Sequence, residues 1–454
     1  MFKKILIANR GEIAVRIIRA ARELGISTVA VYSEADKDAL HTILADQAIC
    51  IGPARSTDSY LNMKSILSAA MITGAQAIHP GFGFLSENSK FATMCEEMNL
   101  KFIGPSASVM DKMGDKINAR SEMKKAGVPV IPGSEGEIFS VQEAKGIAAK
   151  IGYPLMLKAS AGGGGKGIRK VESEFGLEDA FNSASQEALS AFGNGAMYVE
   201  KVIYPARHIE VQVLGDAYQN VIHLGERDCS LQRNNQKVLE ESPSIAIGPT
   251  LRKEMGDAAV RAAKAVDYEN AGTIEFLLEE ESGQFYFMEM NTRIQVEHPV
   301  TEFVTGIDIV KEQIKIAAGL ELTHSQEDIH ISGHAIECRI NAENPNLNFA
   351  PSPGKITDLY LPCGGVGLRV DSAVYNGYTI PPYYDSMIAK IIVHGEDRFD
   401  ALMKMQRALY ELEIEGISTN IEFQLDLISD KQVIAGDYDT SFLMEDFLPH
   451  YHKE

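Results

Sequence analysis

Two short strands near the middle of the chain place acidic side chains where a fold tolerates them only beside a cation. Residues 285–291 have the aromatic and apolar run of a buried strand, and residues 273–278 have the same character. The polar residues between them are typical of a turn, so the pair predicts a hairpin centred near Ser282. In that register Glu275 lies directly opposite Glu289.

Two carboxylates at facing strand positions repel each other unless a cation lies between them. Because strand side chains alternate between faces, Glu289, Asn291 and Arg293 share one face. Carboxylate and amide oxygens without His or Cys indicate Mg²⁺ or Mn²⁺, partly held by a substrate phosphate, and the guanidinium adds a partner for an anion. The alternative is a solvated hairpin, which Phe285 and Phe287 disfavour because they make the strand appear buried on both faces.

Length, charge and cysteine content limit the class of protein. A chain of 454 residues predicts roughly three domains at ~150 residues each. The net charge of −20 argues against nucleic acid or an anionic membrane as the main partner, and no apolar run approaches the ~18 residues of a membrane span. The five cysteines are scattered without paired spacing, which fits a reducing cytoplasm better than a disulfide framework or a zinc site.

The first 114 residues alternate strands and helices, which predicts a parallel, Rossmann-like unit of an α/β protein. A strand at residues 4–8 is followed by a helical pattern from Gly11. The turn between them has one glycine and not the three of the dinucleotide fingerprint, so no dinucleotide is inferred. The loop at residues 79–88 follows a strand, where open sheets place ligands; a tight structural turn is an equal alternative.

The next region contains a glycine-rich segment between two lysines. Four glycines and Lys166 follow a strand that ends at Lys158. Consecutive glycines are costly to order but allow backbone N–H groups to close over phosphates, as a lid that excludes water; a flexible linker is the alternative. Lys116 begins a predicted helix, where a nucleotide phosphate is well received. Glu200 and Lys201 end a strand at a place suited to an adenine edge.

Two later segments complete the pattern. The polar run at residues 226–237 is dense with hydrogen-bond donors, and a solvated surface loop is its alternative. In the third region, residues 335–343 predict a strand that carries Glu337 and Arg339 on one face. The tripeptide at residues 403–405, Met-Lys-Met, surrounds the biotin-bearing lysine of carrier domains, but here it lies in a continuous helical pattern, so the carrier interpretation is rejected.

Taken together, five segments resemble the biotin carboxylase component of biotin-dependent carboxylases, a branch of the ATP-grasp enzymes. Their order and spacing match from end to end: Ile-Ala-Asn-Arg-Gly-Glu-Ile-Ala at 7–14, His-Pro-Gly-Phe-Gly-Phe-Leu-Ser-Glu-Asn at 79–88, Lys-Ala-Ser-Ala-Gly-Gly-Gly-Gly-Lys-Gly at 158–167, Glu-Arg-Asp-Cys-Ser-Leu-Gln-Arg at 226–233, and Glu-Met-Asn-Thr-Arg-Ile-Gln-Val-Glu-His at 289–298. The resemblance implies a Rossmann-like N-terminal domain (1–114), a central ATP-grasp domain (115–334) with a mobile glycine-rich lid (about 131–203), and a C-terminal mixed α+β domain (335–446).

The resemblance also implies the reaction: ATP and bicarbonate give carboxyphosphate, which carboxylates the ureido nitrogen of biotin on a separate carrier protein. It assigns catalysis to Glu297 as the base, with Arg293, Lys237 and Arg339, the last steadying the biotin enolate oxygen. Bicarbonate and biotin contacts fall on Lys237, Arg293, Gln295, Val296, Arg339, Phe82 and Gly83. Two Mg²⁺ or Mn²⁺ ions fall on Glu275, Glu289 and Asn291. Nucleotide contacts fall on Lys116, Lys158, Gly164, Gly165, Lys166, Gly167, Glu200, Lys201, His208, Gln232, Asn235, Glu275 and Glu289.

One departure and several alternatives remain. Some family members have histidine where Asn235 stands, which indicates a changed ribose or nucleotide contact. The expected partners are a biotin carboxyl carrier protein and the carboxyltransferase subunits of an acetyl-CoA carboxylase, with a homodimer formed through the first and third regions; a pyruvate or propionyl-CoA carboxylase would use nearly the same component. An ATP-grasp ligase of another pathway and a nucleotide-sensing scaffold are the alternatives from other classes.

Overall fold

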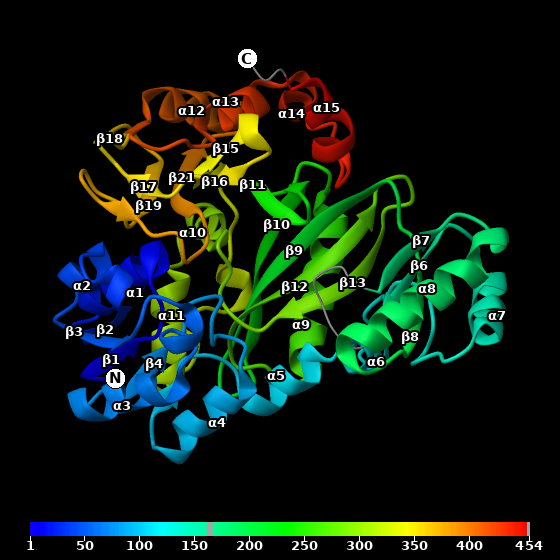
Figure 1. The fold of residues 1–454 in the computed structure, drawn as a ribbon, viewed down its shortest axis with the longest axis horizontal. Coiled ribbons are helices and arrows are strands. Elements are labelled where there is room, and N and C mark those ends of the chain that lie inside the picture. The colour runs from blue at the N-terminus through cyan, green and yellow to red at the C-terminus, as the bar shows by residue number, and fades with distance from the viewer. Residues whose placement is uncertain (161–166, 452–454) are drawn as a thin grey trace.

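The structure, a computed structural model, describes residues 1–160 and 167–451. Its centre is one eight-stranded sheet with strand order β13-β12-β9-β10-β11-β14-β21-β19, and every neighbouring pair is antiparallel. A five-stranded unit formed by the N-terminal segment lies beside this sheet, and a small three-stranded unit stands apart on the other side (Figure 1). No helix in the described ranges is long and apolar enough to cross a membrane.

The N-terminal sheet is parallel, with order β3-β2-β1-β4-β5, which confirms the Rossmann-like prediction. Residues 5–7 of its central strand are fully buried, as expected of a strand covered on both faces. Its strands and main helices are β1 (Lys4–Ile7), α1 (Gly11–Glu23), β2 (Ser27–Ser33), α2 (Leu40–Leu44), β3 (Gln47–Gly52), α3 (Met63–Thr73), β4 (Ala77–His79), α4 (Ser89–Glu97) and β5 (Lys101–Phe102).

The acidic residue that follows β2 is engaged inside the protein. Dinucleotide-binding sheets of this type use an acidic group near this place for a ribose. Here Asp36 is fully buried and accepts hydrogen bonds from Arg10 at 2.6 and 2.8 Å and from Tyr60 at 2.6 Å. Arg10 therefore covers Asp36 at the mouth of the first turn.

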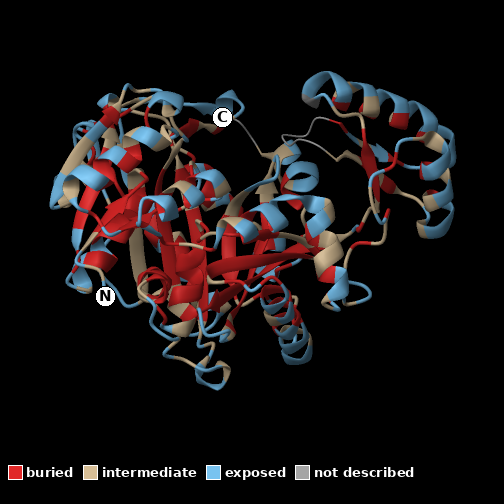
Figure 2. Ribbon diagram, turned by 90° about the horizontal axis from the view of Figure 1, so that it is seen from below, coloured by how far each residue is buried: buried red, intermediate tan, exposed pale blue. Residues whose placement is uncertain are grey.

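A small unit in the middle of the chain is built around its own sheet and its own core, which runs from Ile138 to Val199. The sheet has order β7-β6-β8, with β6 (Leu155–Ala159), β7 (Ile168–Val171) and β8 (Met197–Lys201) packed on α7 (Val141–Ile151) and α8 (Glu174–Phe192). Leu155, Leu157 and Val199 belong to a buried cluster separate from those of the main body (Figure 2). The predicted contacts Gly164, Gly165 and Lys166 lie outside the described residues.

The carboxylate hairpin has the predicted register. Strand β12 (Asn270–Glu279) pairs with β13 (Gln284–Asn291), and Glu275 is the direct partner of Glu289, next to a bulge in the ladder. Helix α9 (Pro249–Ala265) covers one face with Met255 and a row of alanines. The remaining elements of this part are α5 (Ala107–Gly114), α6 (Lys116–Lys125), β9 (Ala206–Gly215), β10 (Val221–Arg233), β11 (Gln236–Ser242), α10 (His298–Thr305) and α11 (Ile309–Ala317).

The C-terminal strands extend the central sheet, which the sequence did not indicate. Strand β14 (His334–Asn341) pairs with β11, so that Glu337 lies opposite Glu240, and β21 (Met387–Gly395) and β19 (Leu368–Ser372) follow. Helices α12 (Arg398–Glu411), α13 (Ile421–Ser429) and α14 (Lys431–Ala435) cover this end, as Figure 1 shows. Residues 403–405 lie inside α12, which confirms the helical prediction for the Met-Lys-Met tripeptide.

Glu241 connects β11 to the C-terminal elements. Its buried carboxylate accepts hydrogen bonds from His334 at 2.6 Å and from Arg398 at 2.7 Å. Burial alone would raise the pKa of Glu241, but His334 and Arg398 outweigh it and hold that pKa well below the ordinary value. The carboxylate therefore stabilises the fold where it is ionised in both states, and this contribution is lost as the pH falls from about 4.5 toward the native pKa.

We expect Glu241→Gln to destabilise the fold by about 3–5 kcal/mol near neutral pH, because it leaves a buried cation without its partner. In thermal unfolding scans the difference in melting temperature between parent and variant should narrow as the pH falls below about 4.5, where the parent loses the stabilisation that ionised Glu241 provides. The control is Asp257→Asn in the exposed Lys253–Asp257 pair, which should change stability by less than about 0.5 kcal/mol. A difference in melting temperature that stays constant with pH would contradict the role given to the ionised carboxylate of Glu241.

Candidate active site

One cavity of about 1120 Å³ lies between the central sheet, the N-terminal unit and the three-stranded unit. The predicted residues that line it are Phe82, Gly83, Lys116, Lys158, Glu200, His208, Gln232, Asn235, Lys237, Glu275, Glu289, Asn291, Arg293, Gln295, Val296, Glu297 and Arg339. Among the described candidates, Lys201 and Gly167 are not part of its lining. Gly167 instead has φ +71°, and a Cβ there would approach Ala159 Cβ to 2.7 Å.

Lys237, on β11, contacts three carboxylates inside this cavity. Its Nζ lies 2.5 Å from Glu210 Oε2, 3.0 Å from Glu275 Oε1 and 2.7 Å from Glu297 Oε1. Burial alone would lower the pKa of Lys237, but the three carboxylates raise it well above the ordinary value. Lys237 is therefore a fixed positive charge at the centre of the site.

Glu297 lies between two cations. Its second oxygen, Oε2, accepts a hydrogen bond from Arg339 Nη2 at 3.0 Å. Burial would raise the pKa of Glu297, yet Lys237 and Arg339 hold it well below the ordinary value. Arg339 also donates to Glu240 Oε1 at 2.6 Å, and burial raises the pKa of Glu240 to about 7 against the effect of Arg339. Glu297 is thus ionised, and any ligand that draws Lys237 away raises the proton affinity of Glu297.

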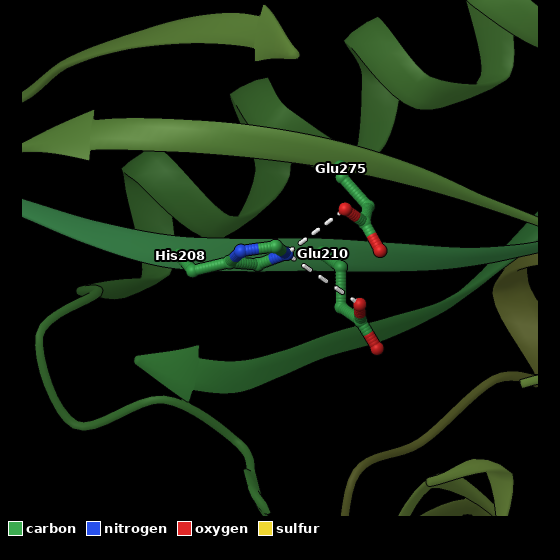
Figure 3. Close-up of side chains that lie close together, drawn as sticks. All are labelled: His208, Glu210 and Glu275. Carbon is green, nitrogen blue, oxygen red and sulfur yellow. Dashed lines mark ion pairs between the residues drawn. The ribbon is translucent and has the colours of Figure 1, made fainter. Parts of the chain in front are cut away.

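Glu210 is a member of the site that we did not predict from the sequence. It is fully buried on β9, between Lys237 and Arg227, whose Nε donates to Glu210 Oε1 at 2.5 Å. Figure 3 shows His208 Nε2 between two carboxylates, 3.2 Å from Glu275 and 3.8 Å from Glu210. The signal was present, since His208, Glu210 and Gln212 alternate along one strand and so share a face.

Arg227 fixes the orientation of Gln295. Its guanidinium is fully buried and donates to Gln295 Oε1 at 2.8 Å. The amide must therefore turn its nitrogen the other way, and Nε2 donates to Glu275 Oε1 at 2.8 Å. The second N–H of that amide has no partner among the described residues, and Gln295 lines the cavity.

Arg293 is held by a carboxylate from the N-terminal unit. Its Nε donates to Glu87 Oε2 at 2.9 Å, and Glu87 Oε1 accepts from the backbone of Thr292 at 3.0 Å. Glu87 belongs to the loop at residues 79–88, so this loop has a role at the cavity and is not merely a turn. The sequence motif contained Glu87, but only the fold shows its partner.

The three predicted metal ligands lie together at the hairpin. Asn291 Nδ2 donates to Glu275 Oε1 at 2.8 Å, and its oxygen accepts from Arg293 Nη2 at 3.2 Å. Burial and the facing Glu275 raise the pKa of Glu289, as expected of two buried carboxylates that face each other. The set consists of hard oxygen donors, so its chemistry fits Mg²⁺ or Mn²⁺.

The cavity lining also carries the cations predicted for a nucleotide. Lys158, at the end of β6, forms an ion pair of 2.6 Å with Glu200, and Arg120 approaches the same carboxylate at 3.0 Å. Lys116 is the first residue of α6, whose N-terminus is capped by Asp115. Arg120 is a second cation that the sequence alone did not single out.

Asn235 has a structural reason to occupy its position. Strands β10 and β11 are joined by Asn234 and Asn235, both with positive φ, between the paired residues Arg233 and Gln236. A two-residue hairpin turn of this type prefers asparagine or glycine. The polar run before it is mostly buried in β10, so the alternative of a solvated loop is wrong.

Comparison with known proteins identifies the family. Three family models match along the chain: Biotin carboxylase, N-terminal domain (1–110), Carbamoyl-phosphate synthase L chain, ATP binding domain (115–325), and Biotin carboxylase C-terminal domain (337–445). Biotin carboxylase 1 of Bacillus subtilis is 61% identical over 443 residues, with 98% of each chain covered. The chain belongs to the biotin carboxylase family.

Solved structures of other biotin carboxylases have the same fold. The enzyme of Campylobacter jejuni, in a complex with ATP, is 53% identical, covers 98% of each chain and has a TM-score of 0.93. The biotin carboxylase domain dimer of Hydrogenobacter thermophilus 2-oxoglutarate carboxylase, with MgADP and bicarbonate, is 53% identical, covers 98% and 97%, and has a TM-score of 0.91. The expected architecture of N-terminal, ATP-grasp and C-terminal parts is confirmed. The activity of this biotin carboxylase is the ATP-dependent carboxylation of biotin.

We expect Glu275→Gln to raise the Mg²⁺ concentration needed for half-maximal ADP release by about 10-fold or more, because the hairpin loses one charged ligand. The measurement is an Mg²⁺ titration at fixed ATP. Glu281→Gln, in the exposed turn of the same hairpin, is the control and should match the parent. An unchanged titration for Glu275→Gln would remove this carboxylate from the metal site.

Proposed function

We propose that this biotin carboxylase is the ATP-using component of an acetyl-CoA carboxylase, and that Glu297 deprotonates bicarbonate in its cavity. The main support for the role of Glu297 is the position of Lys237. Its ammonium pairs with Glu297 at 2.7 Å and with Glu275 at 3.0 Å, and so joins the proposed base to the proposed metal site. Three of the relatives that carry the name biotin carboxylase are matched over 98–99% of their own length.

Bicarbonate is a weak nucleophile, and its activation is the first task of the site. An anion bound between Lys237 and Arg293, beside the free N–H of Gln295, would share the charge of Lys237 and weaken its hold on Glu297. The carboxylate of Glu297 then takes the bicarbonate proton, and the bicarbonate oxygen attacks the γ-phosphorus of ATP as the bond to ADP breaks. The products of this step are carboxyphosphate and ADP.

Glu275, Glu289 and Asn291 are the residues that would hold Mg²⁺ or Mn²⁺. When bound there, two such ions neutralise charge on the β- and γ-phosphates during the transfer. Lys116 and Lys158 would approach the nucleotide from the other side, where the carboxylate of Glu200 pairs with both Lys158 and Arg120. An incoming phosphate competes with Glu200 for Lys158, as bicarbonate competes with Glu297 for Lys237.

Arg339 is the residue proposed to stabilise the biotin enolate oxygen. It lines the cavity together with Phe82 and Gly83, which we assign to the biotin end. Its present bonds to Glu240 and Glu297 keep its guanidinium in place while negative charge develops on biotin. The phosphate released as carboxyphosphate decays to CO₂ is the proposed acceptor of the proton on the biotin nitrogen.

The remaining assignments follow from the same proposal. The biotin is carried by a separate biotin carboxyl carrier protein, and a carboxyltransferase receives the carboxyl group. We propose a cytoplasmic homodimer, with domains at 1–114, 115–334 and 335–446 and a lid at about 131–203. The dimer is supported by the Hydrogenobacter thermophilus domain, which is described as a dimer.

A pyruvate carboxylase is the second candidate for the parent enzyme. A pyruvate carboxylase component from Methanothermobacter thermautotrophicus is 55% identical over 445 residues, which cover 98% of this chain and 90% of that protein. Reconstitution separates the two: the chain is mixed with the carrier and carboxyltransferase components of each type, and malonyl-CoA or oxaloacetate is measured. Faster product formation with the acetyl-CoA set supports the proposal, and preference for the pyruvate set overturns it.

We expect Glu297→Ala to lower the rate of biotin- and bicarbonate-dependent ADP release about 100- to 10,000-fold, the usual contribution of a general base. Affinity for Mg·ATP, measured by calorimetry, should stay near that of the parent, because Glu297 contacts Lys237 and Arg339 and not the phosphate lysines. The exposed Glu281→Ala is the matched control. Equal turnover in Glu297→Ala and the parent would remove Glu297 from the mechanism.

A further inference from the structure

A fully buried lysine lies where the N-terminal unit, the central loop and the C-terminal strands meet. Lys390, on β21, has no exposed surface, and its Nζ donates a hydrogen bond of 2.7 Å to the carbonyl of Val296. Glu297, the proposed base, is the next residue. Glu12 Oε1, on α1, and Asp371 Oδ2, on β19, lie 3.3 and 4.0 Å from the same ammonium.

Two carboxyl groups near Lys390 lack other partners. All four side-chain oxygens of Glu12 and Glu337 are buried without a hydrogen bond among the described residues, whereas Asp371 is held by Arg369 at 2.9 and 2.6 Å. Burial raises the pKa of both Glu12 and Glu337, and Lys390 is the strongest opposing positive charge for each. Lys390 is therefore the main cation that stabilises the buried carboxyl groups of Glu12 and Glu337 at this junction.

The loop that carries the proposed base is fixed by contacts from several sides. The His298 ring holds the Gln295 carbonyl at 2.8 Å, Arg227 holds the Gln295 amide, and Lys390 holds the Val296 carbonyl. Of these three, only Lys390 reaches in from the C-terminal strands. A carbonyl bond to a buried ammonium is strong and directional, so it restricts the peptide that leads into Glu297.

The other side of the junction leads to the biotin end of the cavity. Glu12 is three residues after Asn9, whose amide donates to the carbonyls of Pro80 and Phe82, both at 2.7 Å. Phe82 is one of the residues assigned to biotin. The chain of contacts thus runs from Glu297 through Lys390 and the start of α1 to the loop at residues 79–88.

We infer that Lys390 is a positioning residue for the activation of bicarbonate, the step in which Glu297 takes its proton and its oxygen attacks ATP. Its ammonium fixes the Val296–Glu297 peptide and, through Glu12, keeps that peptide in a constant relation to the biotin end. Lys390 does not line the cavity, so it acts through Val296 and not on the substrates. The inference rests on the proposed role of Glu297 as the base.

The test uses a variant that removes the charges together. Lys390→Met alone leaves Glu12 buried without its cation, a change that can unfold the protein. The double variant Glu12→Gln with Lys390→Met removes the charge of Glu12 together with its cation, and it removes the bond to Val296. Glu337 remains, and burial raises the pKa of Glu337, which favours its neutral form once Lys390 is gone. We expect kcat/KM for bicarbonate to fall about 10- to 100-fold, because a displaced catalytic group costs this much, with KM for ATP unchanged. The fraction of ADP release that needs no biotin should rise.

Two further variants separate positioning from a general structural effect. Glu12→Gln alone keeps the bond from Lys390 to Val296. Its kcat/KM for bicarbonate should therefore fall much less than that of the double variant. Lys4→Met removes a comparable bond, from Nζ to the Thr73 carbonyl at 2.8 Å, outside the cavity and should match the parent. All proteins are compared below their melting transitions.

If kcat/KM for bicarbonate were equal in the double variant and in Glu12→Gln, the inference would be overturned, because the bond from Lys390 to Val296 would then contribute nothing to this step. A fall of kcat/KM for ATP by the same factor as kcat/KM for bicarbonate would also overturn it, because Lys390 would then stabilise the whole fold and not the bicarbonate site in particular. The parent protein serves as the check on the proposed function: if its own ADP release does not depend on bicarbonate and biotin, the proposed function fails first.

Discussion

The contact of Lys237 with three buried carboxylates is the interaction on which the site depends. Glu210 comes from β9, Glu275 from β12 and Glu297 from the residue before α10, so one ammonium joins two strands of the central sheet to the loop that leads into α10. Buried carboxylates at this density are tolerated only with positive charge among them. An anionic substrate would bind to the same positive charge. The ammonium of Lys237 would therefore serve both the stability of the fold and the binding of substrate.

Competition for a cation explains several features at once. Glu297 is paired with Lys237 and Arg339, and Glu200 is paired with Lys158 and Arg120. Each pairing keeps a cation in place, and each is weakened when an anion arrives. The hairpin is different, because Glu275 and Glu289 face each other and the pKa of Glu289 is raised. In the proposed scheme the two ends of the cavity therefore bind anions, and the hairpin between them binds a metal ion.

Local patterns predicted the parts of this site that lie close in sequence. The period of two along 273–278 and 285–291, with a polar turn between them, was sufficient to place Glu275 opposite Glu289. The alternation in 335–343 placed Glu337 and Arg339 on one face for the same reason. Glu210, Arg227 and Glu240 were missed, because their partners are brought to them by pairings such as β11 with β14, which no local pattern records. The family resemblance supplied roles for other residues, and only the fold showed which groups share a proton or a charge.

The most direct test of the account is the bicarbonate dependence of ADP release in Lys237→Met. With Mg·ATP and free biotin, turnover should fall about 100-fold or more and lose its dependence on bicarbonate, since the cation that binds the anion and controls Glu297 is gone. The variant should still bind ATP, because the phosphate lysines Lys116 and Lys158 remain. A variant that retains the parent's rate and the parent's bicarbonate dependence would contradict the central role of Lys237.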